Sequence, residues 1–273
     1  TGDGNTVVGS EAAEDITTGN YNTVMGQQAM QNAQTPVHTT VAVGWRAGYK
    51  LGDDGVSNHS SNNVLLGVMA GGGGSSTVAA NTANTNVAIG NYALAGNNAN
   101  TTFSSTNCVA IGHDALDSIQ GGYSNTAVGH AAGDTITGGA FNVVIGTNAA
   151  VSTANAENQI VIGRGATGIG DHSVTLGNSS VTDVYMAQDS GSTVHAGDAE
   201  FIKNTDGVTQ GLLLANNQAA AASSTKEAVQ VLFGLSGEND SGVIRVGKDE
   251  DYTSSGAKSS FMSFYVKADG TTS

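Results

Sequence analysis

The chain has 273 residues and carries 23 acidic against 9 basic side chains, which gives a net charge of −14. It contains 39 glycines, 5% aromatic residues, one proline and one cysteine. The negative charge excludes nucleic-acid binding through a basic surface, the lone cysteine excludes a framework of intrachain disulfides, and no apolar run reaches membrane-spanning length.

Ten copies of one short motif fill the first two thirds of the chain. A large aliphatic residue precedes a glycine in every copy, and a β-branched residue stands three positions before that glycine. Alanine stands three positions after it in nine copies, and Ser180 takes that place in the tenth. The glycines are Gly9, Gly26, Gly44, Gly67, Gly90, Gly112, Gly129, Gly146, Gly163 and Gly177. Such regular columns identify a repeat protein.

Each copy predicts a short β-strand. Val87-Ala88-Ile89 alternates large and small residues with the period of two that is typical of strands. Stacked about 4.8 Å apart, ten such strands form a solenoid about 48 Å long. We expect the outer residues of each strand, such as Val109 and Ile111, to fill the interior of the chain. Asparagine stands four positions before the glycine in six copies, where its amide can cap the incoming turn.

The middle residue of each strand is then expected to face away from that interior. The middle column is largely apolar and often small, and a long apolar stripe on a solenoid indicates burial against other copies of the chain. Small residues would allow the copies to approach closely around a shared axis. The interface residues predicted in this way are Ala42, Ala88, Ala110 and Ala127.

The longest copies carry polar insertions. Between Gly26 and Gly112 the extra residues are rich in Asn, Thr and Ser, and insertions in a solenoid often project from its binding side. Aromatic residues near these segments could stack on sugar rings. We therefore take Trp45, Tyr49, Tyr92 and Phe103 as candidate receptor-binding residues. The alternative, that the insertions are solvated spacers with locally packed aromatics, stays open at this point.

Two histidines stand at equivalent positions in neighbouring copies. His113 and His130 each follow a repeat glycine, so we expect them to lie one above the other. Such a ladder could hold a transition metal. Asn91 and Thr147 occupy the same position in the adjoining copies, which indicates a polar turn. We therefore expect no metal site and no cofactor.

The acidic residues do not form a repeated pattern. Asp114 and Asp117 are close in sequence, as are the residues of the run 249–251, but neither group recurs at the spacing of the repeat. A glycoside hydrolase needs two carboxyl groups that converge on one cleft. No nucleophile paired with a base is recognisable either, so we do not expect an enzyme.

The last third of the chain has a different composition. Residues 181–273 carry 12 acidic and 6 basic side chains, whereas the longer segment 1–180 carries 11 and 3. The stretches EAVQVLFGL, SGVIRVGK and SSFMSFYVKADG alternate apolar and polar residues between turn-forming residues, which predicts a small antiparallel β module. We therefore expect a repeat domain over 1–180 and a C-terminal β module of fibre or neck type over 181–273.

The motifs NTNVAIGNYA, NCVAIGHDA, SNTAVGHAA and FNVVIGTNA carry a family resemblance. They are similar to the head repeat of trimeric autotransporter adhesins, the YadA-like left-handed parallel β-roll. The resemblance covers Gly9 to about Ser180 and implies an all-β fold of about ten rungs that assembles as a homotrimer. Most rungs here are longer than the family's unit, and the family's coiled-coil stalk is absent. The segment after the repeats instead resembles the distal parts of bacteriophage tail fibres and tailspikes.

These resemblances imply a structural and adhesive protein. The expected function is the receptor-binding segment of a trimeric bacteriophage tail fibre on the virion surface, attached to a glycan or protein of the host cell, with no nucleic acid and no membrane insertion. The alternatives are the head of a bacterial adhesin on an outer surface and, in another class, a tailspike-like depolymerase. An ice-binding solenoid is disfavoured because the middle column holds a single threonine. Related fibres continue into a chaperone that sets the register of three chains, so we expect the gene to extend beyond Ser273.

Overall fold

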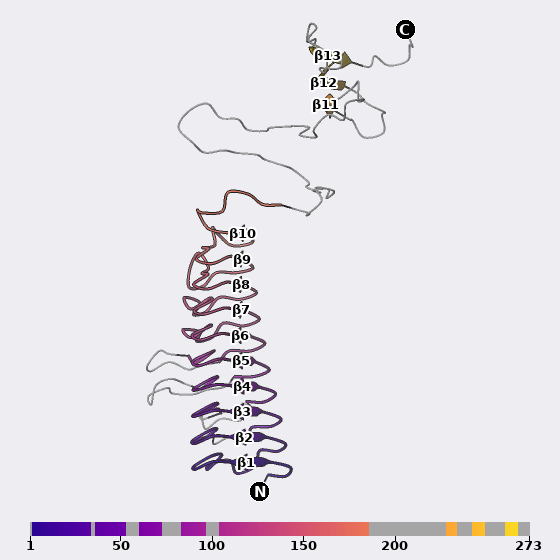
Figure 1. The fold of residues 1–273 in the computed structure, drawn as a ribbon. Coiled ribbons are helices and arrows are strands. Elements are labelled where there is room, and N and C mark those ends of the chain that lie inside the picture. Colours follow the sequence, from indigo (N-terminus) through magenta and orange to yellow (C-terminus); the bar gives the residue numbers. More distant parts are fainter. Residues whose placement is uncertain are drawn as a thin grey trace, which may run out of the picture. The chain divides into compact units, whose positions relative to one another are not determined.

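The computed structural model describes residues 2–33, 36–52, 60–72, 83–96 and 104–185, together with the backbone of three strands within 228–266. The chain divides into two units, Thr1–Tyr185 and Met186–Ser273, a few residues from the predicted boundary. All regular elements of the described residues are strands (Figure 1).

The first unit is built on one parallel sheet of ten strands in chain order. Figure 1 shows them stacked one above another, with one turn of chain between successive strands. Partners match column by column, as in Val87↔Val109, Ala88↔Ala110 and Ile89↔Ile111. The predicted strands and their register are confirmed. They are β1 (Thr6–Val8), β2 (Thr23–Met25), β3 (Val41–Val43), β4 (Val64–Leu66), β5 (Val87–Ile89), β6 (Val109–Ile111), β7 (Thr126–Val128), β8 (Val143–Ile145), β9 (Ile160–Ile162) and β10 (Val174–Leu176).

The core lies between each strand and the segment that follows its glycine. Two columns of buried side chains contribute to it, the middle residue of the strand and the alanine three positions after the glycine. Fully buried members of the first column are Val24, Ala42, Leu65, Ala88, Ala110, Ala127, Val144 and Val161. Those of the second are Ala29, Ala47, Ala70, Ala93, Ala115, Ala132, Ala149 and Ala166.

The predicted assignment of the two strand faces is therefore wrong. Ala110 is fully buried, whereas its neighbour Ile111 keeps 37% of its surface exposed and Val109 is only partly buried. The interior is too narrow for two columns of large aliphatic side chains opposite the alanines. A period of two fixes which residues share a face, but not which face is inside.

Some bulky core residues lie where a glycine leaves room. Leu65 is the largest residue of the middle column, and a side chain at Gly71 would overlap it. Likewise a Cβ at Gly133 would lie 3.0 Å from Leu116 Cδ2. At these places a large side chain is matched by a glycine in its own rung or the next one, as close packing of a protein interior requires.

A ladder of buried amides runs beside the sheet. In one step Asn125 Nδ2 donates to the Gly139 carbonyl at 2.7 Å, and Asn125 Oδ1 accepts from the backbone N–H of Asn142 at 3.0 Å. Asn142 repeats the pattern, with bonds of 2.7 Å to the Ala156 carbonyl and 2.9 Å from the N–H of Gln159. The asparagines do bind backbone groups, but those of the next rung rather than those of their own incoming turn as predicted, so each amide joins two rungs.

The repeat glycine allows successive rungs to approach closely. Gly112 has φ +137°, and a Cβ there would overlap the carbonyl of Gly129 in the next rung. Only glycine combines that backbone angle with the missing side chain. The same relation holds at Gly90 against Gly112.

The second unit contains one antiparallel sheet of three strands, β11 (Ala228–Phe233), β12 (Gly242–Lys248) and β13 (Ser260–Val266). β12 pairs with both neighbours, as in Val231↔Ile244 and Ile244↔Phe264. The three strands fall in the three stretches from which the sequence predicts them.

Candidate functional site

The most extensive candidate surface is the outward face of the ten-stranded sheet. It is formed by the first and third residue of every strand, and these are mostly Val, Ile and Leu. Ile89, Ile111 and Ile145 are each 37% exposed, and Ile162 is 38% exposed. Nine spacings of about 4.8 Å make this stripe about 43 Å long. Continuous apolar surface of this kind is typical of interaction sites.

The four alanines predicted for the contact between copies do not lie on this surface. Ala42, Ala88, Ala110 and Ala127 are fully buried within the chain itself. They pack against the second alanine column and have no surface left for a partner. The neighbouring residues on each strand, one position earlier and one later, form the outward stripe in their place.

Two of the predicted aromatic residues are brought together by an arginine. The guanidinium carbon of Arg46 lies 4.8 Å from the ring centre of Trp45 and 4.9 Å from that of Tyr49. Arg46 Nε donates to Gln28 Oε1 at 2.7 Å, and Asn32 Nδ2 donates to the Tyr49 hydroxyl at 3.0 Å. Trp45 is 40% exposed. The cluster of Trp45, Arg46 and Tyr49 therefore offers a ring, a cation and amides on one exposed patch.

The polar insertions between Gly26 and Gly112 lie only partly within the described residues, which omit 34–35, 53–59, 73–82 and 97–103. Phe103 is among the omitted residues, so its predicted role in receptor binding stays a prediction.

Tyr92, the fourth predicted aromatic residue, belongs to another cluster. Its ring meets the edge of His113 with the ring centres 6.0 Å apart, and it is 37% exposed. His113 in turn stacks on His130, with centres 5.4 Å apart and planes 16° from parallel. The predicted vertical alignment of the two histidines is confirmed.

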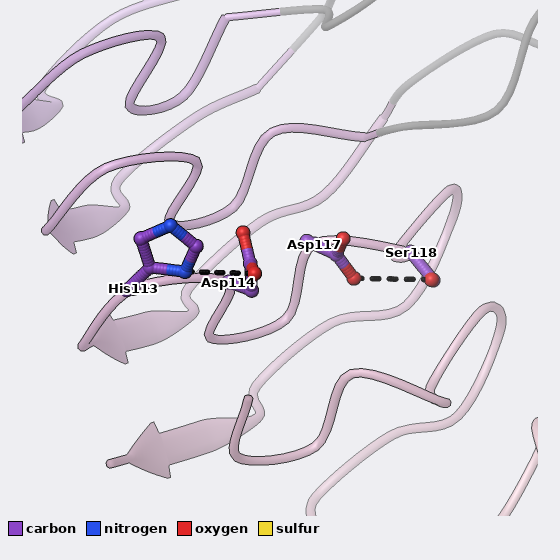
Figure 2. A network of polar contacts seen from close by, with 4 residues as sticks. All are labelled: His113, Asp114, Asp117 and Ser118. Atoms are coloured by element: carbon purple, nitrogen blue, oxygen red, sulfur yellow. Dashed lines mark hydrogen bonds and ion pairs between the residues drawn. The ribbon is translucent and has the colours of Figure 1, made fainter. Parts of the chain in front are cut away.

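Asp114 adds a carboxylate to the histidine pair. Its Oδ2 lies 2.7 Å from His113 Nδ1, as Figure 2 shows. Asp117 instead accepts a hydrogen bond from the Ser118 hydroxyl at 3.1 Å (Figure 2). The two carboxylates thus have different partners.

An exposed aromatic pair was not predicted from the sequence. Tyr123 and Phe141 meet edge to face with ring centres 5.1 Å apart, and they are 44% and 49% exposed. Both stand at the corner where the chain enters a strand, in columns that are otherwise mostly polar. Aromatic residues in these mostly polar columns were the signal from which the pair could have been predicted.

Comparisons with protein-family models, with curated proteins and with solved structures gave no match. Among the described residues, no helix has the length and apolar character that a membrane crossing needs.

Proposed function

We propose that this chain is a structural and receptor-binding segment of a trimeric fibre, and that the fibre is a bacteriophage tail fibre exposed on the virion surface. The observation that carries the proposal is the outward apolar stripe along all ten strands. A single chain would leave this stripe in water at every rung. A fibre of several chains buries it along the whole length of the repeat.

The trimer packs the outward sheet faces of three chains around a common axis. Aliphatic residues of the first and third strand positions meet there, in place of the alanines inferred from the sequence. Because the stripe is continuous and regular, each rung contributes a similar contact. We also propose that the coil is left-handed, because its repeat resembles the adhesin head repeat.

The receptor site lies on the side of the fibre away from the axis. The cluster of Trp45, Arg46 and Tyr49 combines an exposed ring with hydrogen-bonding amides, which suits a sugar that stacks on one face and presents hydroxyls at its edge. The net charge of −14 disfavours strongly anionic partners. A neutral host-surface glycan is therefore the proposed ligand class.

Binding to bacterial surfaces tests this proposal. Labelled protein is titrated against a panel of bacterial strains and their purified surface polysaccharides. We expect saturable binding to some of them, and a loss of about tenfold in affinity, or about 1.4 kcal/mol, for Trp45→Ala or Tyr49→Ala.

The control is Tyr123→Ala, which removes an exposed ring elsewhere on the same solenoid. Circular dichroism and thermal melting show that each variant is folded. Binding that survives both Trp45→Ala and Tyr49→Ala would contradict this receptor site, and a protein that binds nothing across the panel would contradict the receptor-binding function.

A further inference from the structure

Backbone hydrogen bonds fix the corner that carries His113, Asp114 and His130. The N–H of Asp114 donates to the Asn91 carbonyl at 3.1 Å, and the N–H of Ala131 donates to the His113 carbonyl at 2.8 Å. The His130 carbonyl accepts from the N–H of Asn148 at 2.9 Å. Backbone bonds among four successive rungs therefore hold these positions in place before any ligand is considered.

The side chains at this corner converge. Among the described residues, His113, Asp114 and His130 form a group in which one ligand atom from each lies within 4.8 Å of the others. Both histidines are exposed, and Asp114 is half-buried. Their rings are already parallel, and the ring of Tyr92 borders the pair from the rung on the other side of His113.

These distances are close to those of a metal site. Zinc binds nitrogen and oxygen ligands at about 2.0–2.2 Å in a tetrahedral arrangement, so two ligands of one ion lie about 3.3–3.6 Å apart. His113 Nδ1 and Asp114 Oδ2 are 2.7 Å apart and contact each other directly, so an ion that enters between them replaces this contact and moves the two atoms apart by less than about 1 Å. His130 is exposed and offers a ring nitrogen within 4.8 Å of the ligand atoms of the other two residues, so a small rotation of its side chain brings it to the same centre.

We propose that His113, Asp114 and His130 bind one divalent transition-metal ion per chain, of the Ni²⁺, Cu²⁺ and Zn²⁺ group. Two imidazoles and one carboxylate suit these ions, whereas Ca²⁺ and Mg²⁺ prefer oxygen ligands throughout. Three protein ligands on an open corner leave the remaining coordination positions to water. The ion links the rungs of β6 and β7 through their side chains.

The sequence alone predicted no metal site, and the position of Asp114 beside the two histidines is the reason to propose one. Two stacked histidines alone are also explained by a polar turn, as Asn91 and Thr147 in the same column indicate. The third donor lies on the adjacent column, where the carboxylate of Asp114 is 2.7 Å from His113 Nδ1. The site lies within one chain and does not depend on the proposed trimer.

Isothermal titration of untagged, metal-free protein with Zn²⁺ tests the proposal. We expect about one ion per chain and no binding of Mg²⁺ under the same conditions. His113→Asn, His130→Thr and Asp114→Asn should each weaken Zn²⁺ binding by at least about tenfold. Asn91, Thr147 and Asn148 already occupy the equivalent columns, so these substitutions fit the backbone and the fold should be retained.

His172→Asn serves as the matched control. His172 is an exposed histidine with φ +58° in a column where Asn158 already stands at φ +52°, and it lies outside the proposed site. This variant should bind Zn²⁺ like the original protein. Electron paramagnetic resonance of the Cu²⁺ form should show two imidazole nitrogens, and only one after His130→Thr. Zn²⁺ binding that is absent, or unchanged in His113→Asn and His130→Thr, would overturn the proposal.

Discussion

At the scale of single residues, the buried amide ladder ties each rung to the next. Cys108 interrupts it, because a thiol stands where most other copies place asparagine. Its Sγ lies 3.8 Å from the Gly122 carbonyl, whereas the amide of Asn125 reaches its own carbonyl partner at 2.7 Å. Cys108 is still joined to the preceding rung, because its backbone N–H donates to Asn86 Oδ1 at 2.8 Å. The amide ladder is therefore weakened only between the rung of Cys108 and the rung that follows it.

Removing a member of the ladder should destabilise the chain. In Asn125→Ala the Gly139 carbonyl and the N–H of Asn142 lose their partners inside the protein. A buried polar group left without a partner costs about 1–3 kcal/mol. Urea unfolding should show this loss, whereas Cys108→Asn should leave stability equal or raise it. Equal unfolding midpoints for Asn125→Ala and the original protein would contradict the role of the ladder.

The thiol of Cys108 should be unreactive in the folded chain. Burial is the largest influence on it and raises the pKa of the thiol, outweighing the hydrogen bonds from Asn125 and Ser124 that lower it. The reactive thiolate is therefore scarce, and the sulfur is covered. At pH 8 a disulfide reagent should modify Cys108 only after urea unfolds the protein. Rapid modification under native conditions would show that this rung opens.

At the scale of the element, the repeat glycine is the point where the backbones of two successive rungs come closest. The strand supplies three residues, and the glycine after it allows the backbones to come together at the corner. Rungs of different length are accepted, since strands 17 residues apart and strands 23 residues apart keep the same register. The corner at the repeat glycine, in contrast, should tolerate no added side chain.

Gly112→Ala should disrupt the stacking of β6 on β7. A methyl group at Gly112 overlaps the Gly129 carbonyl, and φ +137° is unfavourable for any residue with a side chain. Gly121→Ala is the matched control, because the nearest atom to its added methyl group would be Ser104 Oγ at 3.7 Å. Thermal melting should fall strongly for the first variant and little for the second. Equal melting temperatures would contradict the close packing of the corner.

Ala110→Asp should prevent the chain from folding stably. The new carboxylate would be buried between two alanine columns with no partner, which costs several kcal/mol. Urea unfolding monitored by circular dichroism measures the effect. Thr153→Asp, on an exposed turn, adds the same charge without burial and should change stability little. A fully stable Ala110→Asp protein would mean that the middle column is not inside.

At the scale of the whole molecule, regular columns made the architecture predictable, and irregular positions did not. The ten glycines and their flanking residues predicted ten parallel strands in register. The face inside the roll was mispredicted, although the alanine after each glycine already indicated a narrow interior that Ala110 fits and Ile111 does not. The contact between His113 and Asp114 joins two adjacent residues of one rung, and the spacing of the repeats does not reveal it. The pair of Tyr123 and Phe141 joins neighbouring rungs in different columns, so no single column contained it.

The outward stripe decides how the molecule assembles, and sedimentation equilibrium of the isolated protein at micromolar concentration measures this most directly. The account predicts the mass of three chains for the original protein. Replacing Ile89 and Ile111 by Asp places charges on the outward face and should yield folded, strand-rich chains with the mass of one, while Thr153→Asp remains a trimer. A folded monomer of the original sequence, or a trimer that persists in the Ile89→Asp, Ile111→Asp variant, would contradict it.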